Sequence, residues 1–383
     1  GNGFLDGIDG RLMLTGGIDV ATGMPFTGRL AAPGDAAVIE PIAGSNRGIA
    51  LGCGLQIHGG VPTSEVLAKR VYEGDPYLTT LAGIDECIRN LVCVGANPNR
   101  IAILDNFCWP SCEKPENLGT LVRASEACYD GAMAYRTPFV SGKDSLNNQL
   151  RYEDPVTGDK RVIEIPPTLL ITGLAIVNNV NRCVTMDAKS AGNTLLLIGA
   201  TNGDIGGSHF GQLYGDGGAA FPKTDLSVGP GTARAVAQCI ADGLVQSAHD
   251  CSDGGLLVAI AEMLIATTGR QASSKADLGS TSSALGALLA GQADLQPLGA
   301  TLSIKDDLLE TWELAFAENP SRYVLEVKAE DVQKVRNVLR DFNCGPCVVA
   351  GTLNNSGVLA WQGGDLSARV VDLAQAWLTP LAW

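Results

Sequence analysis

Apolar and polar positions follow two patterns along this chain, and each pattern predicts one kind of secondary structure. Short apolar runs are typical of buried strands, whereas apolar residues three and four positions apart are typical of a helix with one buried face. The predicted strands are 35–42, 100–107, the start of 137–148, 168–177, 194–200, 321–327 and 346–352. The predicted helices are 77–96, 118–135, 231–244, 255–269 and 331–342. Because both halves of the chain mix strands with helices, the pattern predicts an α/β or α+β fold.

The polarity pattern also suggests where the domains begin and end. The chain of 383 residues is long enough for two to three domains. A small polar break at 187–193 predicts a boundary between an N-terminal domain, 35–189, and a C-terminal domain, 190–383. Residues 1–34 are rich in Gly and Asp and predict an irregular lead-in or linker. Residues 270–299 are rich in Ala, Ser, Gly and Gln, and we expect a mobile insertion there.

Composition narrows the class of protein. The net charge of −14 argues against nucleic acid as the main partner, but it allows a phosphorylated ligand, because Mg²⁺ bridges carboxylates to phosphate. The cysteines are odd in number, 11, and scattered, which is typical of reduced thiols in the cytosol. No apolar run reaches the ~18 residues of a membrane span, and no signal peptide is visible. The chain starts at Gly1, as a fragment or a processed product would. We expect a cytoplasmic protein that binds neither nucleic acid nor membrane.

The segment "HDCSDGG", 249–255, carries more polar side chains than an ordinary surface turn needs. It lies where a predicted strand ends before a predicted helix, and such a turn presents backbone N–H groups and a positive helix end to anions. Asp250 and Ser252 are therefore candidate ligand contacts. Capping of the helix by Ser252 or Asp253 explains the same residues, and the two interpretations are compatible.

Three further positions carry candidate chemistry. Glu86 and Asn90 are four residues apart in a predicted helix, so their side-chain oxygens share one face, an arrangement that suits Mg²⁺. An ordinary solvated helix face explains this pair as simply. Lys143, in "SGKDSLNN" after a predicted strand, can contact phosphate as a point charge, or it belongs to a polar loop that caps the next element. The glycine-rich segment 201–218 allows close approach to a phosphate but is not a Walker sequence.

The cysteine motifs do not indicate redox or zinc chemistry. In "CGPC", 344–347, a predicted helix precedes the motif and a predicted strand follows it, the reverse of the thioredoxin order. We therefore predict inert thiols in a loop or at a strand edge. Cys108 and Cys112 have no matching pair at zinc-ribbon spacing, and the 3 histidines exclude a histidine-rich metal site.

Several motifs, taken in order, resemble one known family. They are "APGDAAVIEP", "GDPYLTTLAGIDECIRNLVCVGANPNRIAILDNFCWP", "PFVSGKDSLNN", "IPPTLLITGLAIV", "GGSHFGQLYG" and "AHDCSDGGLLVAIAEM". Together they look like the synthetase part of phosphoribosylformylglycinamidine synthase, within the aminoimidazole ribonucleotide (AIR) synthase superfamily. The resemblance is strong over 28–270. Residues 1–27 and 270–299 do not align, and "GCGLQIHGG", 52–60, stands where relatives often have Asp or Asn.

This resemblance implies a fold and an activity. The fold is the two-domain AIR-synthase-like fold, with an N-terminal sheet able to pair into a barrel-like dimer and a C-terminal α/β domain. The chain resembles the second of two tandem synthetase halves. The family converts formylglycinamide ribonucleotide, ATP and glutamine-derived ammonia to formylglycinamidine ribonucleotide, with Mg²⁺. ATP phosphorylates the formyl amide oxygen, and ammonia then displaces phosphate to give the amidine.

The resemblance also carries site residues over to this chain. The family's metal ligands fall on Asp35, Glu86, Asn90 and Asp250, and its nucleotide contacts fall on Gly34 and Ser252. On the residues alone, Asp35 is only an aspartate at the start of a strand. We expect the side-chain oxygens of the four metal ligands to lie within roughly 8 Å of a common point, which allows for Mg–O bonds of ~2.1 Å and bridging water or phosphate.

Partners and alternative functions follow from the same resemblance. The expected partners are a first synthetase half, in the same or a separate polypeptide, and a glutaminase domain or subunit; the isolated chain can also form a homodimer. One alternative is a non-catalytic half that binds Mg-nucleotide, ATP or ADP, and supports a catalytic partner half. Another is a stand-alone ATP-dependent synthase of the same superfamily.

Overall fold

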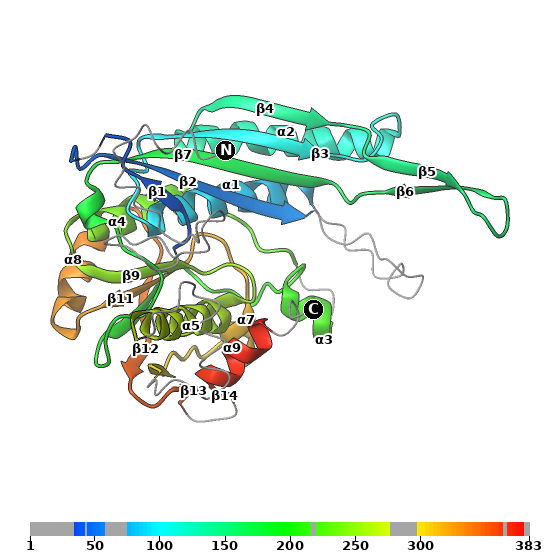
Figure 1. The fold of residues 1–383 in the computed structure, drawn as a ribbon. Coiled ribbons are helices and arrows are strands. Elements are labelled where there is room, and N and C mark those ends of the chain that lie inside the picture. The colour runs from blue at the N-terminus through cyan, green and yellow to red at the C-terminus, as the bar shows by residue number, and fades with distance from the viewer. Residues whose placement is uncertain are drawn as a thin grey trace.

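The computed structural model describes residues 34–42, 44–57, 75–215, 220–275, 297–362 and 366–378. The predicted lead-in up to residue 33 lies outside the described residues, as does 276–296, most of the predicted insertion. The described residues form two main sheets with helices packed against them (Figure 1). None of the helices in this part of the chain is long and apolar enough to cross a lipid bilayer.

A five-stranded sheet with the order β1-β2-β7-β3-β4 forms the upper layer in Figure 1. Its strands are β1 (Ala37–Ile39), β2 (Gly48–Ile57), β3 (Ile101–Cys108), β4 (Phe139–Ser145) and β7 (Thr168–Val177). β2 and β7 pair antiparallel along their whole length, and β4 runs parallel to β3 at one edge. β5 (Gln149–Glu153) and β6 (Lys160–Glu164) form a separate two-stranded ribbon that projects from the sheet (Figure 1).

Two helices, α1 (Pro76–Cys93) and α2 (Pro115–Tyr135), cover one face of the five-stranded sheet. The contact with α1 is close because β7 carries a glycine there. A Cβ at Gly173 would lie 2.6 Å from Leu91 Cδ1 and 2.7 Å from Cys87 Sγ. Glycine inside a strand often marks such an approach of another element.

The opposite face of the five-stranded sheet is apolar and exposed. Leu51 and Leu55 of β2 are 41% and 47% exposed, and Leu174 of β7 is 45% exposed. An uncovered apolar patch on a sheet commonly marks an interaction site. Pairing of this face into a barrel-like dimer remains a prediction. Such pairing would bury the exposed leucines of the patch.

A seven-stranded sheet with the order β14-β13-β10-β12-β8-β11-β9 forms the centre of the other domain. Its strands are β8 (Thr194–Ile198), β9 (Val245–Asp250), β10 (Gly299–Leu302), β11 (Tyr323–Val327), β12 (Cys347–Asn354), β13 (Val358–Trp361) and β14 (Ser367–Arg369). The helices of this domain are α3 (His209–Tyr214), α4 (Gly229–Ala241), α5 (Gly255–Lys275), α7 (Thr311–Phe316), α8 (Val332–Arg340) and α9 (Val370–Leu378). Short 3₁₀ turns are η2 (Val180–Arg182) and η3 (Ala329–Asp331).

Both faces of the seven-stranded sheet are buried, as the continuous apolar run of β8 predicts. Leu195 and Leu197 join one buried cluster with Leu256 of α5. Leu196 and Ile198 point to the other face and join a second cluster. Successive side chains of a strand alternate between faces, so one strand supplies both clusters.

The two sheets separate between β7 and β8, and the polar break 187–193 lies in that connection. One buried cluster nevertheless runs through both domains, because it includes Leu91 of α1 and Val236 of α4. Two sheets, each with its own helices, thus form the two-domain α/β arrangement that the sequence predicts. The exact domain limits remain a prediction.

One local prediction was wrong. The segment from Ser141 onward was expected to leave the sheet as a polar loop, but β4 continues to Ser145. Its backbone pairs with β3 as far as Cys108 opposite Ser145. β4 is an edge strand whose side chains are mostly exposed, so its polar composition reflects solvent exposure and not a break in the strand.

Candidate nucleotide and metal site

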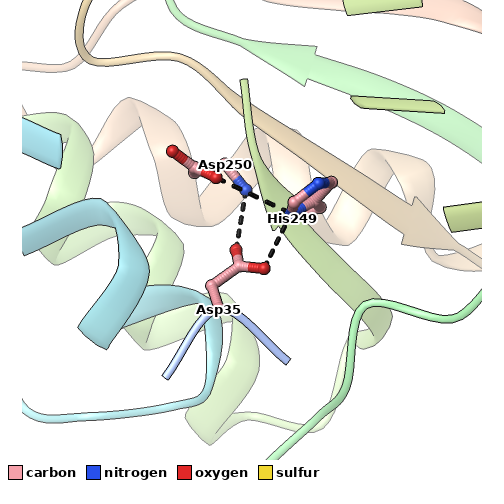
Figure 2. A group of neighbouring side chains, drawn as sticks. All are labelled: Asp35, His249 and Asp250. Atoms are coloured by element: carbon pink, nitrogen blue, oxygen red, sulfur yellow. Dashed lines mark hydrogen bonds and ion pairs between the residues drawn. The ribbon is translucent and has the colours of Figure 1, made fainter. Parts of the chain in front are cut away.

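Asp35, just before β1, lies against the end of β9 in the other domain (Figure 2). Its Oδ1 atom is 2.7 Å from His249 Nδ1, and its Oδ2 atom accepts a hydrogen bond of 2.8 Å from the backbone N–H of Asp250. The Asp35 side chain is only 2% exposed. Residues more than two hundred positions apart in the sequence therefore form one compact group.

His249 lies between two carboxyl groups. Its second ring nitrogen, Nε2, is 2.9 Å from Glu262 Oε2 on α5. Burial alone would lower the pKa of His249, but the Asp35 charge and the hydrogen bonds to Asp35 and Glu262 raise that pKa well above its usual value. With a carboxyl group at each nitrogen, the ring is expected to be an imidazolium that donates on both sides.

Asp250 joins this group to helix α1. Its Oδ2 atom is 3.3 Å from Arg89 Nη2, and Arg89 also pairs with Asp85 one turn earlier. Burial raises the pKa of the Asp250 carboxyl, and the Arg89 charge opposes this shift. Asp85 in turn accepts a 2.7 Å hydrogen bond from the backbone N–H of Ser321 and another bond from Tyr135. A buried polar network thus crosses from one domain to the other.

A cavity of about 440 Å³ opens beside this group. Its polar wall consists of Gly34, Asp35, Asn90, His249, Asp250 and Glu262, and its apolar wall consists of Met186, Ile265, Ala266 and Trp377. Asn90 donates from Nδ2 to the carbonyl oxygen of Cys53 at 2.7 Å. This hydrogen bond leaves the Asn90 Oδ1 atom as the acceptor of that amide.

The donor atoms at the cavity fit a hard divalent cation. Asp35, Asn90 and Asp250 offer carboxylate and amide oxygens, which are the ligands that Mg²⁺ prefers. Counted over the polar network, four carboxyl groups face two cationic groups, an excess of two negative charges that one divalent cation would balance. The carboxyl groups are those of Asp35, Asp85, Asp250 and Glu262, and the cationic groups are those of Arg89 and His249.

Glu86 and Ser252 are near this cavity but do not line it. Glu86 Oε2 accepts a 3.0 Å hydrogen bond from the backbone N–H of Leu55 on β2. Ser252 hydrogen-bonds Asp250 and lines a smaller space of about 20 Å³ together with Arg89 and Gly207. The roles of Glu86 and Ser252 as ligands remain predictions.

The backbone conformation explains why "HDCSDGG" ends in two glycines. Gly254 and Gly255 have φ angles of +75° and +72°, which side chains disfavour. Glu318, which the sequence pattern did not single out, accepts hydrogen bonds from Gly254 N at 2.7 Å and His209 N at 2.9 Å. Glu318 therefore joins this turn to the first residue of α3, within the glycine-rich segment.

Sequence reasoning also missed Arg89 and Glu262. Arg89 follows Asp85 by four positions, a spacing that predicts a helical ion pair, but helical spacing does not show that the pair is buried. Glu262 lies at the end of an apolar run, and only the fold places it beside His249.

Lys143 does not lie at the cavity. It is on β4 opposite Asn106 of β3, and it hydrogen-bonds Ser145. Phe107, the next residue on β3, is buried, so alternation places Asn106 and Lys143 on the open face of the five-stranded sheet. The nucleotide role of Lys143 stays a prediction, and it concerns a different surface from that of Asp35 and Asp250.

The CGPC motif has the predicted setting. Cys344 follows α8 and donates to the carbonyl oxygen of Leu339 at 3.2 Å, and Cys347 begins β12. Burial raises the pKa of both thiols. A raised pKa lowers the fraction of thiolate, which is the reactive form.

We expect these thiols to be poor redox groups. The wild-type protein should reduce a small model disulfide no faster than the Cys344→Ser variant, because little thiolate is present at neutral pH. Thiol release followed by absorbance measures the rate. Rapid stoichiometric reduction that disappears in Cys344→Ser would show that the prediction is wrong.

The sequence of this chain is similar to those of known proteins. Residues 33–158 match the N-terminal domain of AIR synthase related proteins, and residues 190–362 match the C-terminal domain. The phosphoribosylformylglycinamidine synthase subunit PurL of Anaeromyxobacter sp. (strain Fw109-5) is 29% identical over 345 residues, covering 90% of this chain and 39% of that protein. This chain thus spans about two fifths of the length of that curated relative.

Solved structures show the same likeness. The structure of PurLQS from Thermotoga maritima has a TM-score of 0.62 at 16% identity and covers 90% of this chain and 47% of that chain. T. maritima PurL complexed with ATP has a TM-score of 0.56 at 16% identity and covers 85% of this chain and 44% of that chain. At such low identity, these structures are evidence for the fold alone. Together with the two matched family domains, they confirm the predicted two-domain AIR-synthase-like α/β fold.

Proposed function

Because the chain belongs to the AIR synthase related family, we propose that it is a Mg-nucleotide-binding half of an ATP-dependent amidine-forming ligase of purine biosynthesis. The substrates of that ligase are formylglycinamide ribonucleotide, ATP and glutamine-derived ammonia. The observation that carries the proposal is that Gly34, Asp35, Asn90 and Asp250 line one cavity of about 440 Å³. The relatives named above support the class of reaction.

At this cavity, Asp35, Asn90 and Asp250 bind Mg²⁺ through their oxygens, and Glu86 contributes from the preceding turn of α1. Bound Mg²⁺ neutralises phosphate charge and positions the nucleotide. Gly34 allows the phosphates to approach the backbone before β1, and Ser252 contacts them from the turn after β9. Arg89 and His249 hold the Asp250 and Asp35 carboxylates in place through the contacts described above.

The open face of the five-stranded sheet contributes to a second, composite site. Leu51, Leu55 and Leu174 on this face are partly exposed, so a first synthetase half can cover them and bury apolar area. Lys143, on the same face, then points into the junction and contacts a phosphate group. In isolation, a second copy of the chain covers the face instead. Ammonia comes from a separate glutaminase domain or subunit.

The reaction needs an electrophilic amide and a nearby source of ammonia. ATP transfers its terminal phosphoryl group to the formyl amide oxygen, and ammonia displaces it as inorganic phosphate. Positively charged side chains stabilise the charge that spreads over the transferred phosphoryl group. In this proposal the chain supplies Lys143 to that step, and the partner half supplies the remaining groups.

A supporting role for the cavity is the second candidate, and one observation favours it. The polar network around Asp250 runs through Arg89 and Asp85 to Ser321, so a ligand at the cavity is coupled to the packing of the two domains. Nucleotide would then stabilise the fold, and the partner half would carry the catalysis.

Equilibrium binding of ADP to the whole chain tests the proposal. We expect calorimetry to show binding with Mg²⁺ and a loss of at least tenfold in affinity in EDTA, because without Mg²⁺ the carboxylates that line the cavity would repel the phosphates. The Asp35→Asn variant should bind Mg-ADP weakly even with Mg²⁺. Equal binding with and without Mg²⁺ would overturn the metal assignment.

The Lys143→Ala variant separates the sheet face from the cavity. In the enzyme assembled with its partner half and glutaminase, turnover should fall about 10- to 100-fold, since a charged hydrogen bond contributes about 1.5–3 kcal/mol. The rise in melting temperature caused by Mg-ADP should be unchanged, because Lys143 does not line the cavity. Lys328→Ala, an exposed lysine of the other domain, is the matched control. Unchanged turnover in Lys143→Ala would remove this residue from the site.

A further inference from the structure

A second large cavity, of about 360 Å³, lies where the two domains meet. It is formed by the loop 95–99 after α1, the connecting segment 178–182, one side of α4 and Phe342. It shares no lining residue with the nucleotide cavity. Its size is within the range of small-molecule sites, about 300–1,000 Å³.

The charge of this cavity is opposite to that of the protein. The chain has 41 acidic and 27 basic residues, yet the described residues that line the cavity include two arginines, Arg182 of η2 and Arg234 of α4, and no Asp or Glu. Within the described ranges, no ion pair involves either guanidinium. Arginine presents a planar fork of donors that matches phosphate and carboxylate oxygens.

The backbone makes room for one of these guanidinium groups. Gly243, just after α4, has a φ of +75°, and a Cβ there would overlap Arg182 Nη1. Arg182 Nη1 therefore lies against the backbone just after the end of α4. The two positive charges come from the connection between the two sheets and from α4, and both line one cavity.

Neighbouring amides add further donors. The Oδ1 atom of Asn97 accepts a 3.0 Å hydrogen bond from the backbone N–H of Asn99, and the Oδ1 atom of Asn179 accepts one of 3.0 Å from that of Asn181. Each bond identifies Oδ1 as the acceptor, so each Nδ2 group remains a donor. The polar part of the wall is therefore rich in donors, which favours a ligand with several acceptor oxygens.

Two helices end at this cavity, and their negative ends would oppose an anion. Their last carbonyl groups already accept hydrogen bonds. Gly95 N donates to Val92 O at 2.8 Å after α1, and Gly243 N donates to Ile240 O at 2.9 Å after α4. One full negative charge lies next to the wall, because the Asp242 carboxylate accepts a 2.8 Å hydrogen bond from Gln238. The two arginine charges outweigh it, so the balance at the cavity is positive.

Apolar groups complete the wall, among them Pro98, Ile240 and Phe342. A bare inorganic ion would leave these groups in contact with water. We propose that this cavity binds a small phosphorylated organic metabolite, a phosphate monoester, with its phosphate between Arg182 and Arg234 and its organic part against Phe342. The ligand would bridge the two domains. The proposal does not depend on the function proposed for the nucleotide cavity.

Calorimetric titration of the whole chain in EDTA tests this site, with ribose 5-phosphate and inorganic phosphate as probes. EDTA removes Mg²⁺, which the nucleotide cavity is proposed to need for phosphate binding. Ribose 5-phosphate should bind at least tenfold more tightly than inorganic phosphate. Arg182→Gln and Arg234→Gln should each weaken its binding at least tenfold. Gln238→Glu, which keeps both arginines and adds a negative charge to the wall, should do the same.

Two control variants locate the effect. Arg151→Gln removes an exposed arginine from the β5–β6 ribbon and should leave binding unchanged. Asp250→Asn should also leave ribose 5-phosphate binding unchanged, which separates this site from the nucleotide cavity. Equal affinity for the two probes would overturn the organic ligand. No binding, or binding that survives Arg182→Gln, Arg234→Gln and Gln238→Glu, would overturn the site.

Discussion

Replacing Asp250 with asparagine is expected to abolish most of the rise in melting temperature that Mg-ADP produces. A ligand that binds only the folded state stabilises it by RT ln(1 + [L]/Kd), about 2.7 kcal/mol at a ligand concentration of 100 Kd. Asp250 lines the cavity, and its carboxylate is one of the proposed metal ligands. Asparagine keeps the shape but removes a negative charge, so Mg²⁺ and the phosphates that it holds are lost together.

Thermal melts of wild type and Asp250→Asn, with and without Mg-ADP, measure this effect. The comparison uses the ligand-induced shift within each protein, because Asp250→Asn also weakens the contact with Arg89 and lowers the melting temperature of the free variant. Asp159→Asn, an exposed aspartate in the turn of the ribbon, is the matched control and should keep the full shift. An unchanged shift in Asp250→Asn would reject the assignment of the site.

Single-turnover rates of the assembled enzyme then separate support from catalysis. If the nucleotide at this cavity is structural, Asp250→Asn should act through stability and assembly, with the chemical step less affected. A variant that keeps its fold but loses most of the chemical step would instead place Asp250 in the mechanism.

A second large effect is expected at Glu326, which lines neither cavity. This residue of β11 is fully buried, and each of its carboxylate oxygens accepts two hydrogen bonds. The donors are Lys189 N, Ser190 N, Asn193 Nδ2 and Ser247 Oγ, at 2.6–3.0 Å. The carboxylate thus holds the polar break between the domains against the seven-stranded sheet.

Glu326→Gln should destabilise the protein by about 1–3 kcal/mol, the cost of one buried donor without an acceptor. Glutamine has the same shape, but its NH₂ group would face two donors, and three of the four donors around Glu326 are only partly buried. Urea unfolding measures the change. Glu330→Gln, an exposed glutamate a few residues later, is the control and should stay within about 0.5 kcal/mol of wild type. A Glu326→Gln variant as stable as that control would show that the four hydrogen bonds contribute little.

Much of the local structure could be predicted from the order of residues. The helices predicted at 77–96 and 118–135 correspond to α1 and α2, and the strand predicted at 168–177 is β7. Their apolar periods are long and regular. β2 was not predicted, because Gly48, Gly52 and Gly54 interrupt its apolar pattern. Those glycines are explained only by tertiary contacts: a Cβ at Gly54 would overlap the backbone of α1.

Part of the candidate site could also be predicted. The sequence analysis named both Asp35 and the turn after β9 as candidate site residues. In the structure, two hydrogen bonds join Asp35 to His249 and Asp250. Lys143 was also named as a candidate phosphate contact, but it lies on the open face of the five-stranded sheet. A motif shows which groups are present. It does not show on which surface of the fold they lie.

Periodicity and side-chain chemistry are local properties, so most of the elements and the residue types that can bind a metal nucleotide follow from the order of residues. Which of these residues act together depends on the tertiary structure. Asp35 and Asp250 are brought into contact by the packing of two domains, and Arg89, Glu262 and Glu318 gain their roles from partners distant in the chain. The arginines of the second cavity show the same dependence, since Arg182 and Arg234 carry no shared motif and meet only where the domains join.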